Sequence, residues 1–82
     1  MKNNKLSQKD RVIEFIKQTG SVTRLEALTE LGIFELSARI VDLEKEGFEF
    51  IKTPYTIKNK YGESVRMISY SLDEEVKSEV NN

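Results

Sequence analysis

The segment "LSARI", residues 36–40, holds the side chains of this 82-residue chain that are best suited to contact a nucleobase. Ser37 has a hydroxyl that can bond to a base or a phosphate, and Ala38 is small enough to permit close approach. Arg39 can donate two hydrogen bonds to O6 and N7 of guanine in the major groove of DNA. These residues stand in the first half of a segment with helical periodicity. They are therefore candidate base contacts of the second helix in a helix-turn-helix motif.

Acidic residues around this segment allow other interpretations of Arg39. Glu35 and Asp42 lie within about one helical turn of it, where they can pair with it on the protein surface, repel phosphates or fix its orientation. Glu44 and Glu46 fall near the end of the helix, where acids oppose the helix dipole. That end is expected to face solvent or a basic partner. The sequence leaves open whether the flanking carboxylates direct Arg39 toward a base or keep it from one.

A second group of cations, Lys58, Lys60 and Arg66, lies at or beside a predicted turn between two strands. Cations at the tip of a hairpin suit sequence-independent contacts with phosphates, whose strength falls as salt rises. Lysines on an edge strand also prevent strand-to-strand aggregation, so the pattern alone does not choose between these roles. Further cations near the N-terminus form either an arm that reaches a minor groove or a solubilising leader: Lys2, Lys5, Lys9 and Arg11.

The composition excludes several classes of function. The chain is 38% hydrophobic and 33% charged, which is typical of an ordinary globular domain. The absence of cysteine and histidine removes disulfides, zinc-thiolate sites and the commonest general base, and no glycine-rich phosphate loop is present. We therefore expect no enzyme, no metal and no cofactor. No apolar run approaches the roughly 20 residues that span a bilayer, so we expect a cytoplasmic protein without a membrane partner.

Three helices are predicted from apolar spacing and end signals. Ser7 and Asp10 indicate the start of the first helix, and Gly20 its end. Thr23 and Glu26 form a capping box for a second helix that stops at Gly32, with leucines at helical spacing: Leu25, Leu28 and Leu31. The third helix, residues 35–46, ends before Gly47 and directs a stripe inward: Leu36, Ile40 and Leu43. Two short helices joined by about three residues form a helix-turn-helix.

After Gly47 the apolar period changes from 3.6 to 2, which indicates strands. Residues 55–72 are predicted to form a β-hairpin with "NKYGES" as its turn, and "SVT" can add a short third strand. Pro54 suits an edge strand or a bulge. Four aromatic residues belong to the core by spacing: Phe48, Phe50, Tyr55 and Tyr70. The predicted fold is α+β, a winged helix-turn-helix in which three helices precede a β-hairpin wing.

The chain is expected to hold one domain, residues 7–72, between two terminal segments. Residues 1–6 are predicted to be a disordered leader and residues 73–82 an acidic tail. The tail carries Lys77 against four acids, whereas residues 1–72 carry twelve cations and ten acids. The body is thus only weakly basic, which is less than a tight nucleic-acid binder usually shows.

The segment "GSVTRLEALTELGIFELSARIVDLEKEGFEF" resembles a small helix-turn-helix domain family found widely in phages and prophages. The matching features are the start at Gly20 to Thr23, the "EAL" helix, the "LG" turn, the "LSARI" recognition helix and the closing Gly47–Phe48. The resemblance covers roughly residues 10–72. It implies a winged helix-turn-helix DNA-binding domain with Arg39 as the characteristic exposed residue. This sequence departs from the family pattern where basic residues are common, since it has Glu35 and Glu44 there.

Two functions follow from these features. The first is sequence-specific binding of duplex DNA by a phage or prophage transcription regulator or an excisionase-like accessory factor. The recognition helix, residues 35–46, would enter the major groove, and the hairpin, residues 55–72, would lie on the backbone. The alternative is a phage-encoded protein-binding module, such as an anti-defence inhibitor of a host nucleic-acid enzyme, that uses the acidic helix face. In both cases we expect a monomer or weak homodimer in the cytoplasm of a bacterial host.

Overall fold

Local end signals set the bounds of α1 (Gln8–Thr19) in the computed structural model, which describes residues 6–73. The side chain of Ser7 caps the helix and accepts a hydrogen bond from the Asp10 amide at 3.1 Å. Gly20 ends the helix with a φ of 104°, a left-handed conformation that glycine adopts without strain. The predicted start and end of this helix are confirmed. Apart from Leu6 and Asp73, the predicted leader and tail lie outside the described residues.

The second helix joins an α-helical turn, α2 (Arg24–Glu26), to a π-helical turn, η1 (Ala27–Leu31). The predicted capping box is present, because the Thr23 side chain accepts from the Glu26 amide at 3.2 Å and the Glu26 carboxylate accepts from the Thr23 amide at 3.0 Å. At the other end, the Ala27 carbonyl accepts a hydrogen bond from the Ile33 amide at 2.9 Å. This wide last turn draws Ile33 under the helix.

Of the three leucines whose spacing indicates the second helix, only Leu31 packs against the core. Leu25 and Leu28 are 60% and 43% exposed, whereas Ala27 is fully buried. A π-helical turn holds more residues per turn than an α-helix, so spacing of three does not keep side chains on one face there. The small Ala27 therefore allows the second helix to lie close to the core.

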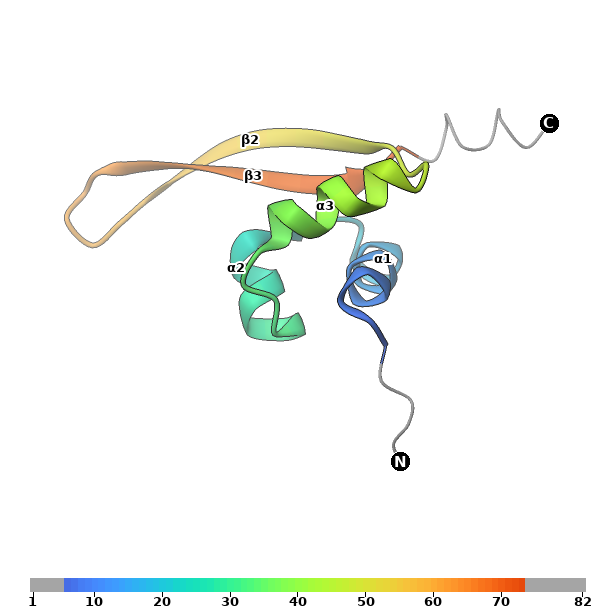
Figure 1. Cartoon of the computed structure of the whole chain (residues 1–82). Helices are drawn as coiled ribbons and strands as arrows, with labels where there is room; N and C mark the ends of the chain where they lie inside the picture. Colours follow the sequence, from blue (N-terminus) through green and yellow to red (C-terminus); the bar gives the residue numbers. More distant parts are fainter. Residues whose placement is uncertain (1–5, 74–82) are drawn as a thin grey trace.

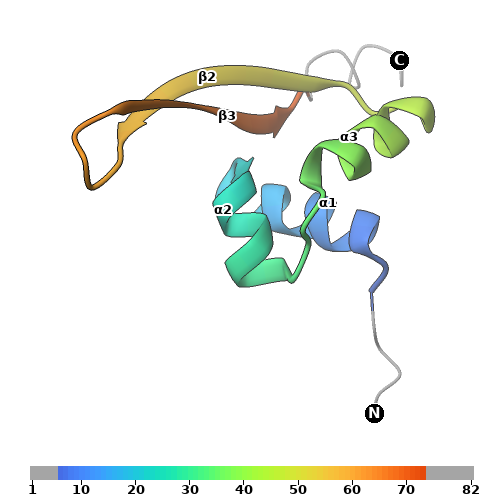
Figure 2. The same ribbon diagram turned by 60° about the vertical axis from the view of Figure 1, so that its left-hand side comes forward.

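The third helix, α3 (Leu36–Lys45), buries the predicted stripe of Leu36, Ile40 and Leu43. Val12 and Ile16 of α1 pack on this stripe, together with Ala27 and Ile33. The core thus fills the space between the three helices, and Figures 1 and 2 show α1, α2 and α3 gathered below the sheet. Partly buried aromatic residues close the core on the sheet side: Phe48, Phe50 and Tyr70.

The sheet contains β1 (Val22–Thr23), β2 (Phe50–Lys58) and β3 (Ser64–Leu72) in the order β1-β3-β2, with antiparallel pairing throughout. The short strand predicted from "SVT" is confirmed as β1. The hairpin begins earlier than predicted, at Phe50, because Pro54 does not interrupt the ladder and lies opposite Ile68. β2 is an edge strand, where the missing amide of a proline is tolerated.

The two faces of the hairpin differ in charge. Alternation along the strands puts Lys52, Lys58 and Arg66 on the face that also carries Phe50 and Tyr70 and packs on the helices at its base. The opposite, outer face holds no charged residue: Ile51, Thr53, Tyr55, Ile57, Val65, Met67, Ser69 and Ser71. Tyr55 was predicted to be a core residue, but the strand register places it on this outer face, opposite Met67.

The distal half of the hairpin extends beyond the helices as a long two-stranded arm (Figure 1). Its turn is ordered by Asn59, whose Oδ1 accepts hydrogen bonds from the amides of Tyr61 and Glu63 at 2.9 and 3.0 Å. Gly62 provides the positive φ, 80°, that the turn requires. The predicted hairpin turn is thus confirmed.

Candidate nucleic-acid interface

The side of α3 opposite its buried stripe is formed by Ala38, Val41 and Lys45, as 3.6 residues per turn requires. Val41 is 46% exposed and Lys45 is also exposed. Ser37 is exposed on the flank of α3 that faces the hairpin, where it lines a groove described below. Of the predicted base contacts, Ser37 and Ala38 therefore occupy the accessible first half of the helix.

Arg39 lies on the other flank of α3, toward α1. Its Nε and Nη2 atoms are 3.1 and 3.0 Å from Oδ2 of Asp42, and its Nη1 donates to Oε1 of Gln8 at 3.3 Å. All three guanidinium nitrogens are thereby engaged, and 31% of the side chain is exposed. Of the two acids that flank Arg39 in sequence, Asp42 makes this contact. The pair spans one helical turn and is partly open to solvent, so it contributes only about 0–1 kcal/mol.

A groove of about 390 Å³ lies between the start of the second helix, the start of α3 and strand β3. It brings Ser37 of α3 together with Arg66 of β3, two residues that were predicted separately. It also contains Arg24, the first residue of α2, which sequence reasoning did not single out. The signal for Arg24 was its place directly after the Thr23 cap, at the start of the motif's first helix. Both arginines are exposed, so the groove carries cations from two elements, with Glu35 as the acid in its lining.

Phe34 lines the same groove and is 77% exposed. It was also missed, because a phenylalanine in the connection "GIF" is expected to pack into the core. Here Ile33 enters the core and Phe34 remains outside. Its ring adds apolar surface just before the first turn of α3.

Comparison with models of protein families identifies the family of this domain. Residues 7–75 match the model of the winged helix-turn-helix domain family. The chain belongs to that family. The predicted fold is therefore confirmed, with α2 and η1 as the first helix of the motif, α3 as the recognition helix and the β2–β3 hairpin as the wing. Comparisons with curated proteins and with solved structures gave no match.

Membership in a winged helix-turn-helix family supports DNA binding as the general activity. The family match does not extend to the phage origin or to the recognition-helix subtype that the sequence resemblance implies. None of the helices within residues 6–73 is both long and apolar enough to cross a membrane.

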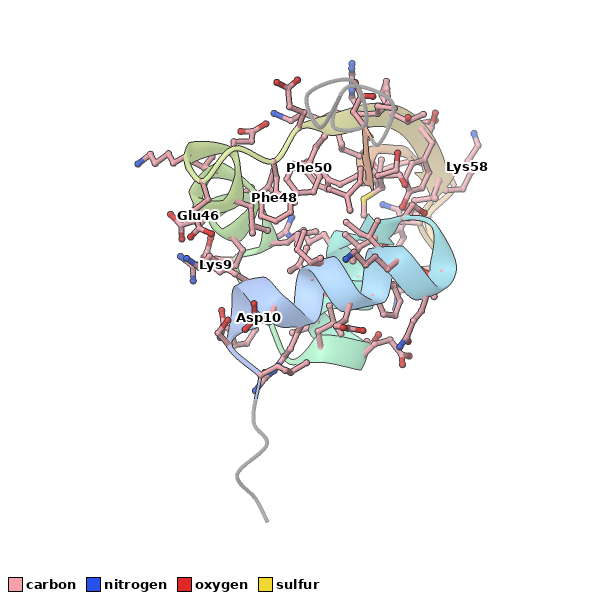
Figure 3. All side chains as sticks on the ribbon, turned by 90° about the vertical axis from the view of Figure 1, so that its right-hand side faces the viewer. Lys9, Asp10, Glu46, Phe48, Phe50 and Lys58 are labelled. Atoms are coloured by element: carbon pink, nitrogen blue, oxygen red, sulfur yellow. The ribbon has the colours of Figure 1, made fainter. Side chains whose placement is uncertain are left out.

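The two remaining predicted contacts, Lys58 and Lys60, lie at the distal end of the wing, away from the recognition helix. Lys58 points outward from β2 (Figure 3), and its Nζ is 3.5 Å from the carbonyl of Gly62. The Nζ atom of Lys60 lies 5.4 Å from the ring centroid of Tyr61, which is itself 76% exposed. The wing thus presents cations both at its tip and, through Arg66, beside the groove.

The acids at the end of the recognition helix face cations of the same domain. Glu46 pairs with Lys9 of α1, and the two side chains meet in Figure 3. The hydrogen bond that Lys9 donates to the Glu46 carboxylate raises the pKa of Lys9 above its usual value. Glu44 pairs with Lys52 of the wing at 3.1 Å. We had expected this end to face solvent or a basic partner, and the basic partners are α1 and β2 themselves.

Proposed function

We propose that this domain binds duplex DNA sequence-specifically, with α3 in the major groove and the wing along the backbone. The observation that carries the proposal is the groove beside the first half of α3, which Arg24 and Arg66 line together with Ser37. In helix-turn-helix proteins this half of the recognition helix meets the base edges. The two arginines in this groove can hold phosphates and Ser37 beside them can bond to a phosphate or a base, while Ala38 faces the bases.

We further propose that the protein is a small regulator or an excisionase-like accessory factor of a phage or prophage. The support is the "LSARI" resemblance together with the exposed first turn of α3 and the two arginines beside it. Lys58 and Lys60 extend the phosphate contacts along the wing.

The alternative, a protein-binding module that uses the acidic helix face, has weaker support. Besides the acidic tail, it depends on four acids of the helix face, and three of these are paired within the domain: Asp42 with Arg39, Glu44 with Lys52, and Glu46 with Lys9. A basic partner would have to displace these internal cations before it could use the carboxylates. We therefore favour DNA as the partner.

The direct test is a titration of duplex DNA at several salt concentrations, followed by fluorescence anisotropy. Four phosphate contacts, from Arg24, Lys58, Lys60 and Arg66, predict that log K falls against log salt with a slope of roughly −3 to −5. Selection from a random duplex pool should then enrich a defined sequence. Absence of binding at low salt, or a slope near zero, would overturn the proposal.

The Asp42→Asn variant should bind duplex DNA more tightly, by about three- to tenfold at low salt, because it removes a charge that repels phosphates and releases Arg39. The measurement is the same titration, made with both proteins side by side. Glu14→Gln is the matched control, since it removes one exposed acid from α1. Equal gains in both variants would show an effect of net charge alone. A loss of affinity in Asp42→Asn would show that Asp42 orients Arg39 for DNA.

A further inference from the structure

The outward side of the recognition helix is apolar where it would meet the bases. Ala38 and Val41 are three residues apart, so they lie on the same face of α3, one above the other. Val41 is 46% exposed, and Phe34, which precedes the helix and lines the groove beside Ser37, is 77% exposed. A single exposed apolar side chain is common on protein surfaces. Here such side chains line up along the helix that would enter the groove.

The polar side chains of α3 that could read other bases are either engaged within the domain or lie off this face. The guanidinium of Arg39, the best candidate for guanine, is held by Asp42 and Gln8. The carboxylate of Glu44 contacts Lys52. Lys45 is exposed but stands at the C-terminal end of α3, beyond the half that meets the bases in this motif. Ser37 lies on the flank that faces the groove beside the wing.

In the major groove the apolar feature of a base edge is the C5-methyl group of thymine. Alanine and other apolar side chains make favourable contact with that methyl group. Against a G·C pair the same side chains would cover donors and acceptors without bonding to them, which is costly. Three residues of helix rise by about 4.5 Å, close to the spacing of neighbouring bases, about 3.4 Å per strand.

We propose that the recognition helix reads thymine through its C5-methyl group, with Ala38 and Val41 contacting methyl groups of neighbouring thymines. This inference rests on the proposed DNA-binding function and specifies its target. It assigns base discrimination to apolar contacts, and it gives Arg39 a role in joining α3 to α1 in the unbound protein. The preferred sites are therefore rich in A·T pairs.

The test compares duplexes that differ in the methyl group alone. A run of dA paired with a run of dT or of dU forms one pair of duplexes, and a run of dG paired with a run of dC, with and without 5-methylcytosine, forms the other. Each lost methyl contact should weaken binding about fourfold, so the dA-dU duplex should bind about 4- to 15-fold more weakly than dA-dT. Methylation of cytosine at C5 should strengthen binding to the G·C duplex, because it adds the methyl group that the helix contacts.

The Val41→Ala variant separates a direct contact from a change in DNA shape. It should reduce the difference between dA-dT and dA-dU, because one of the two methyl contacts is weakened. Val65→Ala is the matched control: it removes the same atoms from an exposed valine on the outer face of the wing and should leave the difference unchanged. Urea unfolding of both variants checks that their folds are intact.

The outcomes distinguish this inference from the function on which it rests. Equal affinity for dA-dT and dA-dU, with binding to both, overturns thymine reading and leaves DNA binding in place. A methyl preference that is the same in wild type and Val41→Ala assigns the preference to DNA shape and also overturns the inference. Failure to bind any duplex at low salt overturns both proposals.

Discussion

Replacing Arg24 and Arg66 together with glutamine should lower the affinity for duplex DNA by about 60-fold at ~0.1 M salt. Each arginine that neutralises a phosphate adds about 0.9 to the steepness of log K against log salt. The double variant should therefore show a slope that is less negative by about 1.8. Because the effect is on the backbone contacts, it should be similar for every DNA sequence.

The structure explains why these two arginines should matter most. They come from different elements, α2 and β3, and line one groove beside Ser37. Within the described part of the chain, neither guanidinium has an ion-pair partner, in contrast to Arg39, Lys9 and Lys52. Binding a phosphate thus requires no internal pair to be broken.

Lys17→Gln is the control for the loss of positive charge, since Lys17 is exposed in the last turn of α1 and outside the groove. It should change the slope little. The single variants Arg24→Gln and Arg66→Gln should each account for about half of the change in slope, about 0.9. A double variant with the wild-type slope would show that the phosphates lie elsewhere on the domain.

Ile40→Ala should destabilise the domain by about 2–5 kcal/mol, because it leaves a cavity beneath the recognition helix. Ile40 is 1% exposed and packs in the core that joins α3 to α1. Small domains unfold with only about 5–15 kcal/mol, so this one change removes much of the stability. The melting temperature should fall by about 10–30 °C. Circular dichroism during urea and thermal unfolding measures both quantities.

The neighbouring substitution Val41→Ala provides the contrast. Val41 is 46% exposed, and alanine is the better helix former, so the free energy of unfolding should change by less than about 1 kcal/mol. Ile40 thus governs the stability of the domain, and Val41 governs the proposed base contact. A similar loss of stability in both variants would contradict the observed orientation of α3.

Much of the fold could be predicted because its signals are local. Ser7, Thr23 and Glu26 cap helices within three residues of themselves, and glycines with positive φ end the elements where expected. The period of two after Gly47 gave the hairpin. The register of Tyr55 was not accessible, since a nine-residue strand with Pro54 inside it has no local marker of which face is buried.

The candidate site was predicted only in part, because its decisive contacts are between distant residues. The sequence left open whether an acid pairs with Arg39, and it gave no sign of the contact with Gln8, 31 positions away, that joins Arg39 to α1. Glu46 pairs with Lys9 across 37 positions. Helical spacing shows which residues share a face, but it does not show which other element lies beside that face. Arg24 was missed for the same reason, because its place in the groove depends on how α2 lies beside α3 and β3.

The hairpin is supported unevenly along its length, and this has a mechanical consequence. Phe50, Tyr70 and Leu72 anchor its base to the core, whereas the distal strands rest on no helix (Figure 1). A two-stranded ribbon twists more readily than a wide sheet, and segments with few buried contacts open at low free energy. The domain therefore combines a recognition helix that is fixed to the core with a hairpin whose distal half can bend. Such an arm can follow duplexes of different curvature while the helix keeps a fixed depth.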